Sequence, residues 1–403
     1  MTNRQSGFSL IEVLIATVVL LVAVAGSLAA LMDAIHASQS VTQMADTQEN
    51  LRAGMNYIVR DLVEAGEGIP QGGITIPNNG LSSNGAPPSG NSNINRPGLS
   101  ATGADVLKFP SSYVTLPAIT PGYQVGFPEQ MPNPNNPYAN ITSPTNTDVI
   151  TLIYADTTLV DNTTYPGTPH TLDEFPIKLA EQNNSTGPGC APSNPGPAPA
   201  GSITVSGTTL TVTFDATCVN INQGNTGLHA GDLIMFESNA SADGIYALMY
   251  VSSVSGQTVQ FLAGDPFNLN GTGLTAGTFN QLDPNTAAIT ATRIWMITYY
   301  LDTVTNPLHP VLMRQVNFAV PQEVGEVIED LAFSYDLTEP SDTPPVSTVS
   351  NIVYPDSPEL IRKVNVFLAA RSETPLPTNR FYFHNNFTTS VNIRSLCFYN
   401  QFN

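Results

Sequence analysis

Hydrophobic positions are concentrated in one unbroken run near the start of the chain. The run extends from Phe8 to Met32 and contains a single charged residue, Glu12. A helix over these 25 residues would be about 37 Å long at ~1.5 Å per residue, which is enough to cross the hydrocarbon layer of a bilayer. The pattern therefore predicts a membrane-spanning helix over residues 8–32.

Apolar residues continue beyond Met32, but there they occupy one side of the predicted helix. They recur at spacings of three and four residues, with one glutamine in the series: Val41, Met44, Gln48, Leu51, Met55, Ile58 and Leu62. This periodicity is typical of a helix that packs one face against a globular body. Glycines and a proline between Gly66 and Pro70 are stop signals. We therefore expect one helix from Phe8 to about Gly66, with an amphipathic half over 33–66.

The rest of the chain favours β structure, because runs rich in β-branched and aromatic residues alternate with Gly, Asn and Pro. The predicted strands are 105–109, 148–154, 202–214, 232–236, 245–251, 258–262, 292–301, 310–318, 327–335, 361–370, 380–383 and 389–396. Segments 70–100 and 121–147, rich in Gly, Asn and Pro and almost without charge, are predicted to be loops.

The expected fold is therefore α+β, a long spine helix packed on a β-rich body. Along the chain we predict a loop-rich region over 67–147, a β-rich subdomain over 148–290 and a C-terminal β-sheet subdomain over 291–403.

The composition narrows the function classes. The chain has 13 basic and 32 acidic residues, for a formal net charge of −19. Binding to phosphate backbones needs clustered Lys and Arg, so no direct nucleic-acid partner is predicted. Gly and Pro number 30 and 33, which indicates many turns and loops rather than a helical enzyme.

Three cysteines occur, Cys190, Cys218 and Cys397, and no two of them have CxxC spacing. A zinc site or a redox dithiol is therefore not predicted. If the body is exported, one disulfide is compatible with the oxidising compartment. Cys190 and Cys218 would close a short loop, but Cys397 is an alternative partner for either, and the sequence leaves the choice open.

No catalytic motif is present, so we predict that the chain is not an enzyme. The five histidines are scattered, without the spacing of a metal site, and no nucleophile elbow or phosphate-binding loop occurs. His229 and Asp232 are interpreted as turn residues, and Trp295, Tyr299 and Tyr300 as core residues. No cofactor and no metal are predicted; calcium is kept as an alternative, because oxygen-rich loops such as 283–285 contain suitable ligand types.

Three interpretations of the N-terminus compete. The first is a secretory signal cut after Ala25, where Ala23-Val24-Ala25 fits the small-residue rule. The second is an uncleaved signal anchor. Neither explains Glu12, since a carboxylate within the apolar run costs about 2.5–3.5 kcal/mol on insertion scales. The third is a short leader that is cut before the apolar helix, so that the helix is retained.

The stretch Ser6-Gly7-Phe8-Ser9-Leu10-Ile11-Glu12-Val13 resembles the cleavage and methylation signature of type IV prepilins. The resemblance implies that prepilin peptidase cuts after Gly7 and that Phe8 becomes an N-methylated N-terminus. It also implies that Glu12 pairs with the α-amino group of Phe8 on a neighbouring subunit during assembly. The alternative is that Glu12 extends towards the lipid headgroups.

The C-terminal part of the chain extends the resemblance. Segments 294–301, 312–315, 327–335 and 362–370 resemble PilW-like minor pilins and the pseudopilin J subunit of type II secretion, and segment 389–396 also resembles the PilW-like group. This implies a minor pilin-like structural subunit that helps to initiate or tip a type IV pilus. The alternatives are a secretion pseudopilin and a membrane-anchored periplasmic binding or enzymatic protein.

The implied location is the inner membrane, crossed once, with the body in the periplasm and later in an extracellular or periplasmic filament. Arg4 before the apolar run supports this orientation by the positive-inside rule. The implied partners are major and minor pilins, prepilin peptidase and the inner-membrane assembly platform.

Overall fold

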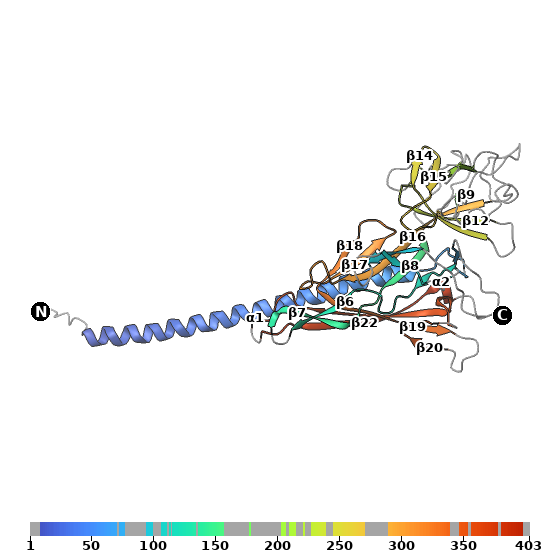
Figure 1. Cartoon of the computed structure of the whole chain (residues 1–403). Coiled ribbons are helices and arrows are strands. Elements are labelled where there is room, and N and C mark those ends of the chain that lie inside the picture. Colours follow the sequence, from blue (N-terminus) through green and yellow to red (C-terminus); the bar gives the residue numbers. More distant parts are fainter. Residues whose placement is uncertain are drawn as a thin grey trace, which may run out of the picture.

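The computed structural model describes residues 9–70, 72–76, 94–99, 106–110, 113, 115–133, 136–156, 177–178, 203–206, 209–214, 221, 227–238, 245–270, 289–338, 346–353, 356–377 and 380–397. One long helix, α1 (Leu10–Glu64), projects from a body of β-sheets that packs on its C-terminal half (Figure 1). The predicted α+β, pilin-like architecture is confirmed.

The ends of α1 agree with the signals in the sequence. Ser9 and Glu12 form a capping box at the start, in which each side chain accepts the backbone N–H of the other. The helix ends before Ala65, and Gly66 follows at a φ of +81°. Glycine is favoured there, because a Cβ would also lie 2.6 Å from the hydroxyl of Ser395.

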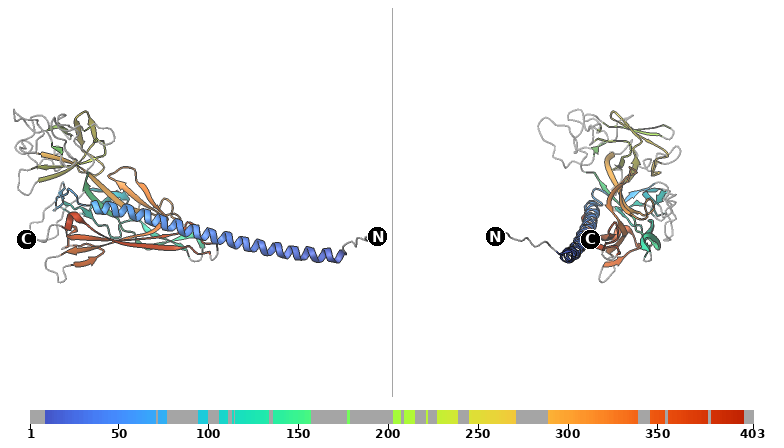
Figure 2. Two further views of the ribbon diagram at one scale, coloured as in Figure 1. Left: turned by 180° about the vertical axis from the view of Figure 1, so that it is seen from behind. Right: turned by 90° about the vertical axis from the view of Figure 1, so that its left-hand side faces the viewer.

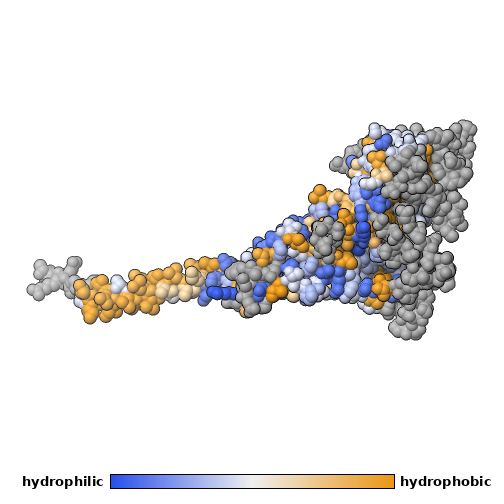
Figure 3. All heavy atoms as spheres, in the orientation of Figure 1, coloured by the Kyte–Doolittle hydropathy of each residue, from blue (hydrophilic) through white to orange (hydrophobic). Residues whose placement is uncertain are grey.

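The N-terminal half of α1 contacts no other part of the described structure. Every side chain from Ser9 to Gln39 is exposed, and Figure 3 shows this half as a mainly hydrophobic rod. Within the described residues, α1 is the one helix with the length and composition to cross a membrane. Exposure of such an apolar surface to water is unfavourable, so we expect this half of the helix to lie in lipid or against other apolar helices.

The C-terminal half of α1 buries one stripe of residues, which are Thr47, Leu51, Gly54, Met55, Ile58, Asp61 and Leu62. The predicted periodicity is confirmed between Leu51 and Leu62. Complete burial of one such aliphatic side chain is worth about 1.5–3 kcal/mol. The assignment of Val41 and Gln48 to this face is wrong, since both side chains are exposed, that of Val41 to 66%. The body begins near Gln43, whose amide donates to the hydroxyl of Thr374.

Two large antiparallel sheets form most of the body. The eight-stranded sheet contains β5 (Ile119–Thr120), β8 (Ile150–Ala155), β9 (Ile177–Lys178), β12 (Leu233–Ser238), β13 (Ile245–Tyr250), β16 (Ile289–Asp302), β17 (Val311–Val316) and β18 (Gln322–Glu326). The second sheet has the order β20 (Val346–Val349), β19 (Ile328–Thr338), β21 (Ile361–Arg371) and β22 (His384–Asn392).

Both large sheets pack on α1. A Cβ at Gly54 would lie 2.9 Å from Leu312 in β17 and 3.7 Å from Leu368 in β21, so the helix approaches one strand of each sheet at the same point. One hydrophobic cluster includes the buried stripe of α1 and residues of both sheets. Figure 2 shows the two sheets beside the same helix from two further directions.

The smaller elements complete the described body. A four-stranded sheet has the order β10 (Ile203–Ser206), β11 (Thr209–Thr213), β15 (Thr258–Leu262) and β14 (Ser253–Ser255). The two-stranded pairs are β1 (Ile74–Thr75) with β4 (Thr115–Leu116), β2 (Asn95–Leu99) with β3 (Val106–Lys108), and β6 (Pro128–Asn133) with β7 (Asn136–Asn146). The short helices are Pro358–Leu360 and α2 (Arg394–Cys397).

Several local predictions need correction. The expected loops 70–100 and 121–147 contain β1, β2 and the β6–β7 hairpin, because pairing with another strand outweighs the poor β propensity of Asn and Pro. The expected strands 380–383 and 389–396 are replaced by one strand, β22, preceded by a turn in which Arg380 has a φ of +59°.

The predicted boundary between residues 290 and 291 falls inside β16. This strand pairs with β8 and β12 from the preceding range and with β17 from the following one. The two ranges therefore share one sheet, and the division of the chain into domains stays a prediction.

Candidate assembly site

Glu12 lies in the first turn of α1, at the end of the helix furthest from the body. Its Oε2 accepts the N–H of Ser9 at 2.9 Å, and its own N–H donates to the Ser9 hydroxyl at 3.4 Å. The cap satisfies two N–H groups that a helix N-terminus otherwise leaves without a partner. An ionised carboxylate has about four lone-pair sites, so this cap leaves capacity for a cation.

A shallow apolar groove begins at Glu12 on the exposed half of α1. Its lining residues are Glu12, Ile15, Ala16, Val19, Leu20 and Ala23. Small side chains such as Ala16 and Ala23 let a second helix approach closely in a membrane. The predicted processing residues Gly7 and Phe8 directly precede this segment and lie outside the described residues. The surface therefore combines an acid with an apolar track for another helix.

Asp61 joins α1 to the body from inside the core. Its side chain is 1% exposed, and its Oδ2 accepts the hydroxyl of Tyr299 at 2.6 Å and Nε of Arg314 at 2.7 Å. Burial raises the pKa of Tyr299 and the carboxylate of Asp61 raises it further. Burial opposes the charge on Arg314, but the hydrogen bond to Asp61 outweighs it and raises the pKa of Arg314. We call these three residues the Asp61 cluster.

Arg96 is buried in the segment that was expected to be a loop. Its guanidinium donates to the Thr151 hydroxyl at 2.6 Å and to the carbonyls of Thr120, Pro121 and Val149 at 2.8–3.1 Å. Burial lowers the pKa of Arg96 to about 10. These bonds hold β2 against β5, β8 and the residues next to them.

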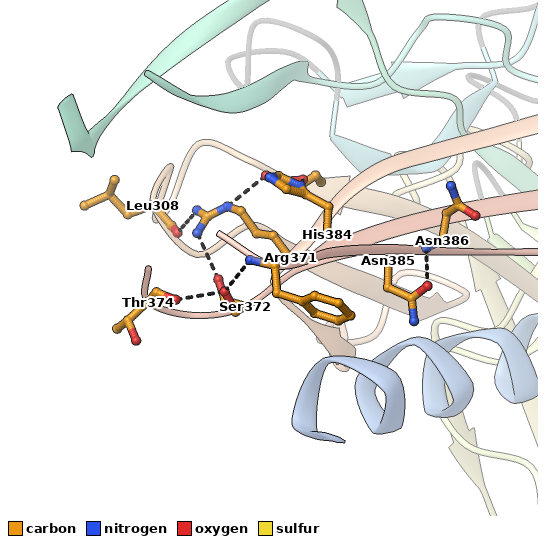
Figure 4. Close-up of polar contacts among 9 residues, drawn as sticks. Leu308, Arg371, Ser372, Thr374, His384, Asn385 and Asn386 are labelled. Carbon is orange, nitrogen blue, oxygen red and sulfur yellow. Dashed lines mark hydrogen bonds and ion pairs between the residues drawn. The ribbon is translucent and has the colours of Figure 1, made fainter. Parts of the chain in front are cut away.

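Arg371 connects the ends of two hairpins through its polar contacts (Figure 4). Its Nε lies 2.8 Å from a carboxylate oxygen of Glu329, and its guanidinium also donates to the carbonyl of Leu308. The ring of Tyr382 lies 4.3 Å from the guanidinium carbon, while His384 contacts the second oxygen of Glu329 at 2.9 Å. This arrangement stabilises the start of β22.

The other residues singled out from the sequence lie in a turn or in the core. Asp232 accepts the N–H of His229 at 2.9 Å in a turn, as expected. Tyr299 and Tyr300 are buried, 0% and 1% exposed. Among the residues that the structure describes, no group of three or more His, Cys, Asp and Glu could hold a metal ion.

The candidate disulfide between Cys190 and Cys218 lies outside the described residues. The alternative partner, Cys397, is the last residue of α2, and its side chain is also outside them.

Sequence reasoning missed Asp61, Arg96 and Arg371. Asp61 had a usable signal, because it falls three residues after Ile58 on the buried stripe of α1. A charged residue at such a position indicates a buried partner elsewhere. Arg96 and Arg371 had no comparable signal, since their partners come from distant parts of the chain.

The pKa values of the buried carboxyl groups lead us to expect a body that is more stable in mild acid than at neutral pH. Burial raises the pKa of Asp148 to about 6, although the N–H groups of Gln124 and Phe333 bond to its carboxylate. A raised folded-state pKa means that the folded chain binds the proton more tightly, so stability increases as the pH falls through 6 towards 4. Burial raises other carboxyl pKa values in the same direction, at Glu129, Asp232, Asp265, Asp330 and Glu359.

We expect the free energy of unfolding to be higher at pH 5 than at pH 7.5, by about 1 kcal/mol from Asp148 alone. Urea unfolding of the whole chain in detergent, followed by the fluorescence of its single tryptophan, measures it. An Asp148→Asn variant should show a smaller increase. Equal stability at the two pH values would contradict the assignment.

The start of the chain matches a known family. Residues 2–28 match the family described as "Prokaryotic N-terminal methylation motif". No curated protein and no solved structure matches the chain. The motif implies processing by prepilin peptidase and assembly of the pilus type, and the apolar helix that follows fits an inner-membrane-anchored prepilin. The chain thus carries the N-terminal methylation motif of the type IV pilin and pseudopilin family.

Proposed function

We propose that the chain is a minor, PilW-like pilin subunit that helps to initiate or tip a type IV pilus. The observation that carries the proposal is Glu12, an acid at the head of an exposed apolar groove and the fifth residue after the proposed cleavage site. In this role the subunit acts structurally, through helix packing and one desolvated ion pair, and no catalysis is required. The body lies in the periplasm and then in the filament.

Cleavage after Gly7 creates the α-amino group of Phe8, and this cation pairs with Glu12 of a neighbouring subunit. Removal of two opposite charges from water costs free energy, and their attraction offsets this cost only when the two groups are in contact. The pair therefore sets the axial position of one helix against the next, while the groove beside Ala16 and Ala23 accepts the neighbour's apolar side chains.

A pseudopilin of type II secretion is the second candidate, because the N-terminal motif is common to pilins and pseudopilins. The two are distinguished by deleting the gene and measuring surface pili and secreted proteins separately. Loss of pili with normal secretion supports the pilus subunit, whereas the reverse result supports the pseudopilin. A membrane-anchored binding or enzymatic protein predicts that neither changes.

Mass spectrometry of the N-terminal peptide tests the processing step. We expect a chain that begins at Phe8 and carries one methyl group on its amine. A Gly7→Val variant should retain Met1 and remain in the membrane fraction, which provides the matched control. A native chain that retains Met1, or that begins at Gly26, would overturn the proposal.

A further inference from the structure

β22 is the last strand of its sheet. It pairs with β21 without a register shift from Lys363 opposite Asn392 to Arg371 opposite His384. Among the described residues, no strand pairs with its other side. One edge of a nine-residue strand therefore remains unpaired in this part of the structure.

Hydrogen bonds at the two ends of β22 show which of its backbone groups face outwards. The N–H of Ile393 donates to the carbonyl of Arg362, and the carbonyl of Phe383 accepts the N–H of Ser372. Bonding alternates along an antiparallel pair, so odd-numbered residues of β22 bond to β21 and even-numbered ones point away. The outward groups belong to His384, Asn386, Thr388, Ser390 and Asn392.

The side chain of Asn385 covers one of these groups, since its Oδ1 accepts the N–H of Asn386 at 2.9 Å (Figure 4). Further along β22, the side chains of Thr388, Ser390 and Asn392 are exposed. The strand itself contains no proline, lysine, acid or bulge, which are among the common protections of a sheet edge. An edge of this kind accepts another strand through main-chain hydrogen bonds.

The direction of β22 relates it to the membrane. The hydroxyl of Ser395, just after β22, donates to the carbonyl of Ala65 at the end of α1. The opposite end of β22 adjoins Ser372, near the contact between Thr374 and Gln43. β22 therefore runs in the same direction as α1. Its nine residues span about 31 Å, and the part of α1 from Gln43 to its C-terminal end spans about 33 Å. Figure 1 shows the two elements side by side.

We propose that the outer edge of β22 binds an extended strand of another subunit that is anchored in the same membrane by its own N-terminal helix. This inference rests on the proposed function. The exposed half of α1 requires apolar neighbours in the membrane. A neighbour anchored there has its body on the same side of the membrane, and because β22 runs parallel to α1, an extended strand of that body can align with this edge. The edge is uncharged between His384 and Asn392, so it does not repel another acidic body, although the chain has a net charge of −19.

A photo-crosslinking amino acid at Thr388 in the full chain identifies the occupant in cells. We expect an adduct with a chain that carries an N-terminal methylation motif, a second copy included. An adduct with a protein that has no such helix, or no adduct, would overturn the proposal. Mass spectrometry of the N-terminus in the same sample distinguishes this failure from failure of the proposed function, because a processed Phe8 shows that the subunit matured.

A backbone variant tests the bonding mode. Thr388→Pro removes an outward N–H but leaves the bonds to β21, and proline is tolerated at such edge positions. We expect adduct formation from a crosslinker at Asn386 to fall at least tenfold in this variant. Thr388→Val, which retains the N–H, should leave it unchanged. Equal adduct from the proline variant and the native chain would exclude strand addition.

Discussion

Replacement of Glu12 by glutamine is expected to reduce incorporation of the chain into filaments by at least about tenfold. Loss of one partner from a desolvated ion pair costs about 3–5 kcal/mol, and about 1.4 kcal/mol corresponds to tenfold in an equilibrium constant. Immunoblotting of sheared filaments, normalised to the amount of chain in the membrane, measures the incorporation.

The glutamine variant separates two roles of Glu12. In the structure this side chain caps its own helix with Ser9, and glutamine at the same position still accepts the N–H of Ser9. Glu12→Gln therefore removes the charge and retains the cap. Ser9→Ala retains the charge and removes the hydroxyl that accepts the N–H of Glu12, at a cost of about 1 kcal/mol to the helix end. We expect incorporation to depend on the charge and only weakly on the cap.

Normal incorporation of Glu12→Gln, together with loss in Glu12→Ala, would assign capping as the role of this residue. The proposed pair with Phe8 of a neighbour would then be wrong. Mass spectrometry must show that each variant is cut after Gly7, because an uncut leader prevents formation of the amine.

The spine helix was predictable because its signals are local. An unbroken apolar run defines its exposed half, and the recurrence of Leu51, Ile58 and Leu62 defines its buried stripe. The extent of the stripe was not predictable, since Val41 fits the same period and is exposed. Periodicity shows which face of a helix is apolar, but a distant part of the chain decides where the body begins.

The positions of the main strands could be predicted from the sequence, but their pairing partners could not. β16 and β21 have long runs of β-branched and aromatic residues, and the expected runs 292–301 and 361–370 lie within them. β7 is rich in Asn and Pro and forms because β6 lies opposite it. The same contrast between local and long-range signals applies to the functional residues. Glu12 could be found from the sequence, whereas the partners of Arg96 and Arg371 depend on contacts between distant segments.

Replacement of Asp61 by alanine is expected to destabilise the body by about 3–5 kcal/mol. The change leaves the guanidinium of Arg314, whose side chain is 12% exposed, and the hydroxyl of Tyr299 without their acceptor. Urea unfolding of the whole chain in detergent, followed by the fluorescence of Trp295, measures the difference. Asp46→Asn, an exposed change on the same helix, should alter stability by less than about 0.5 kcal/mol.

A combined variant shows whether the loss arises from unpaired partners. Asp61→Leu with Arg314→Met and Tyr299→Phe removes all polar groups of the Asp61 cluster together, so no buried donor is left without an acceptor. Replacement of a whole buried ion pair by apolar groups is often neutral. We therefore expect the triple variant to regain most of the stability that Asp61→Ala loses. If the triple variant is as unstable as Asp61→Ala, the loss does not arise from unpaired partners. The polar contacts of the cluster would then make a net favourable contribution to the packing of α1 on the body.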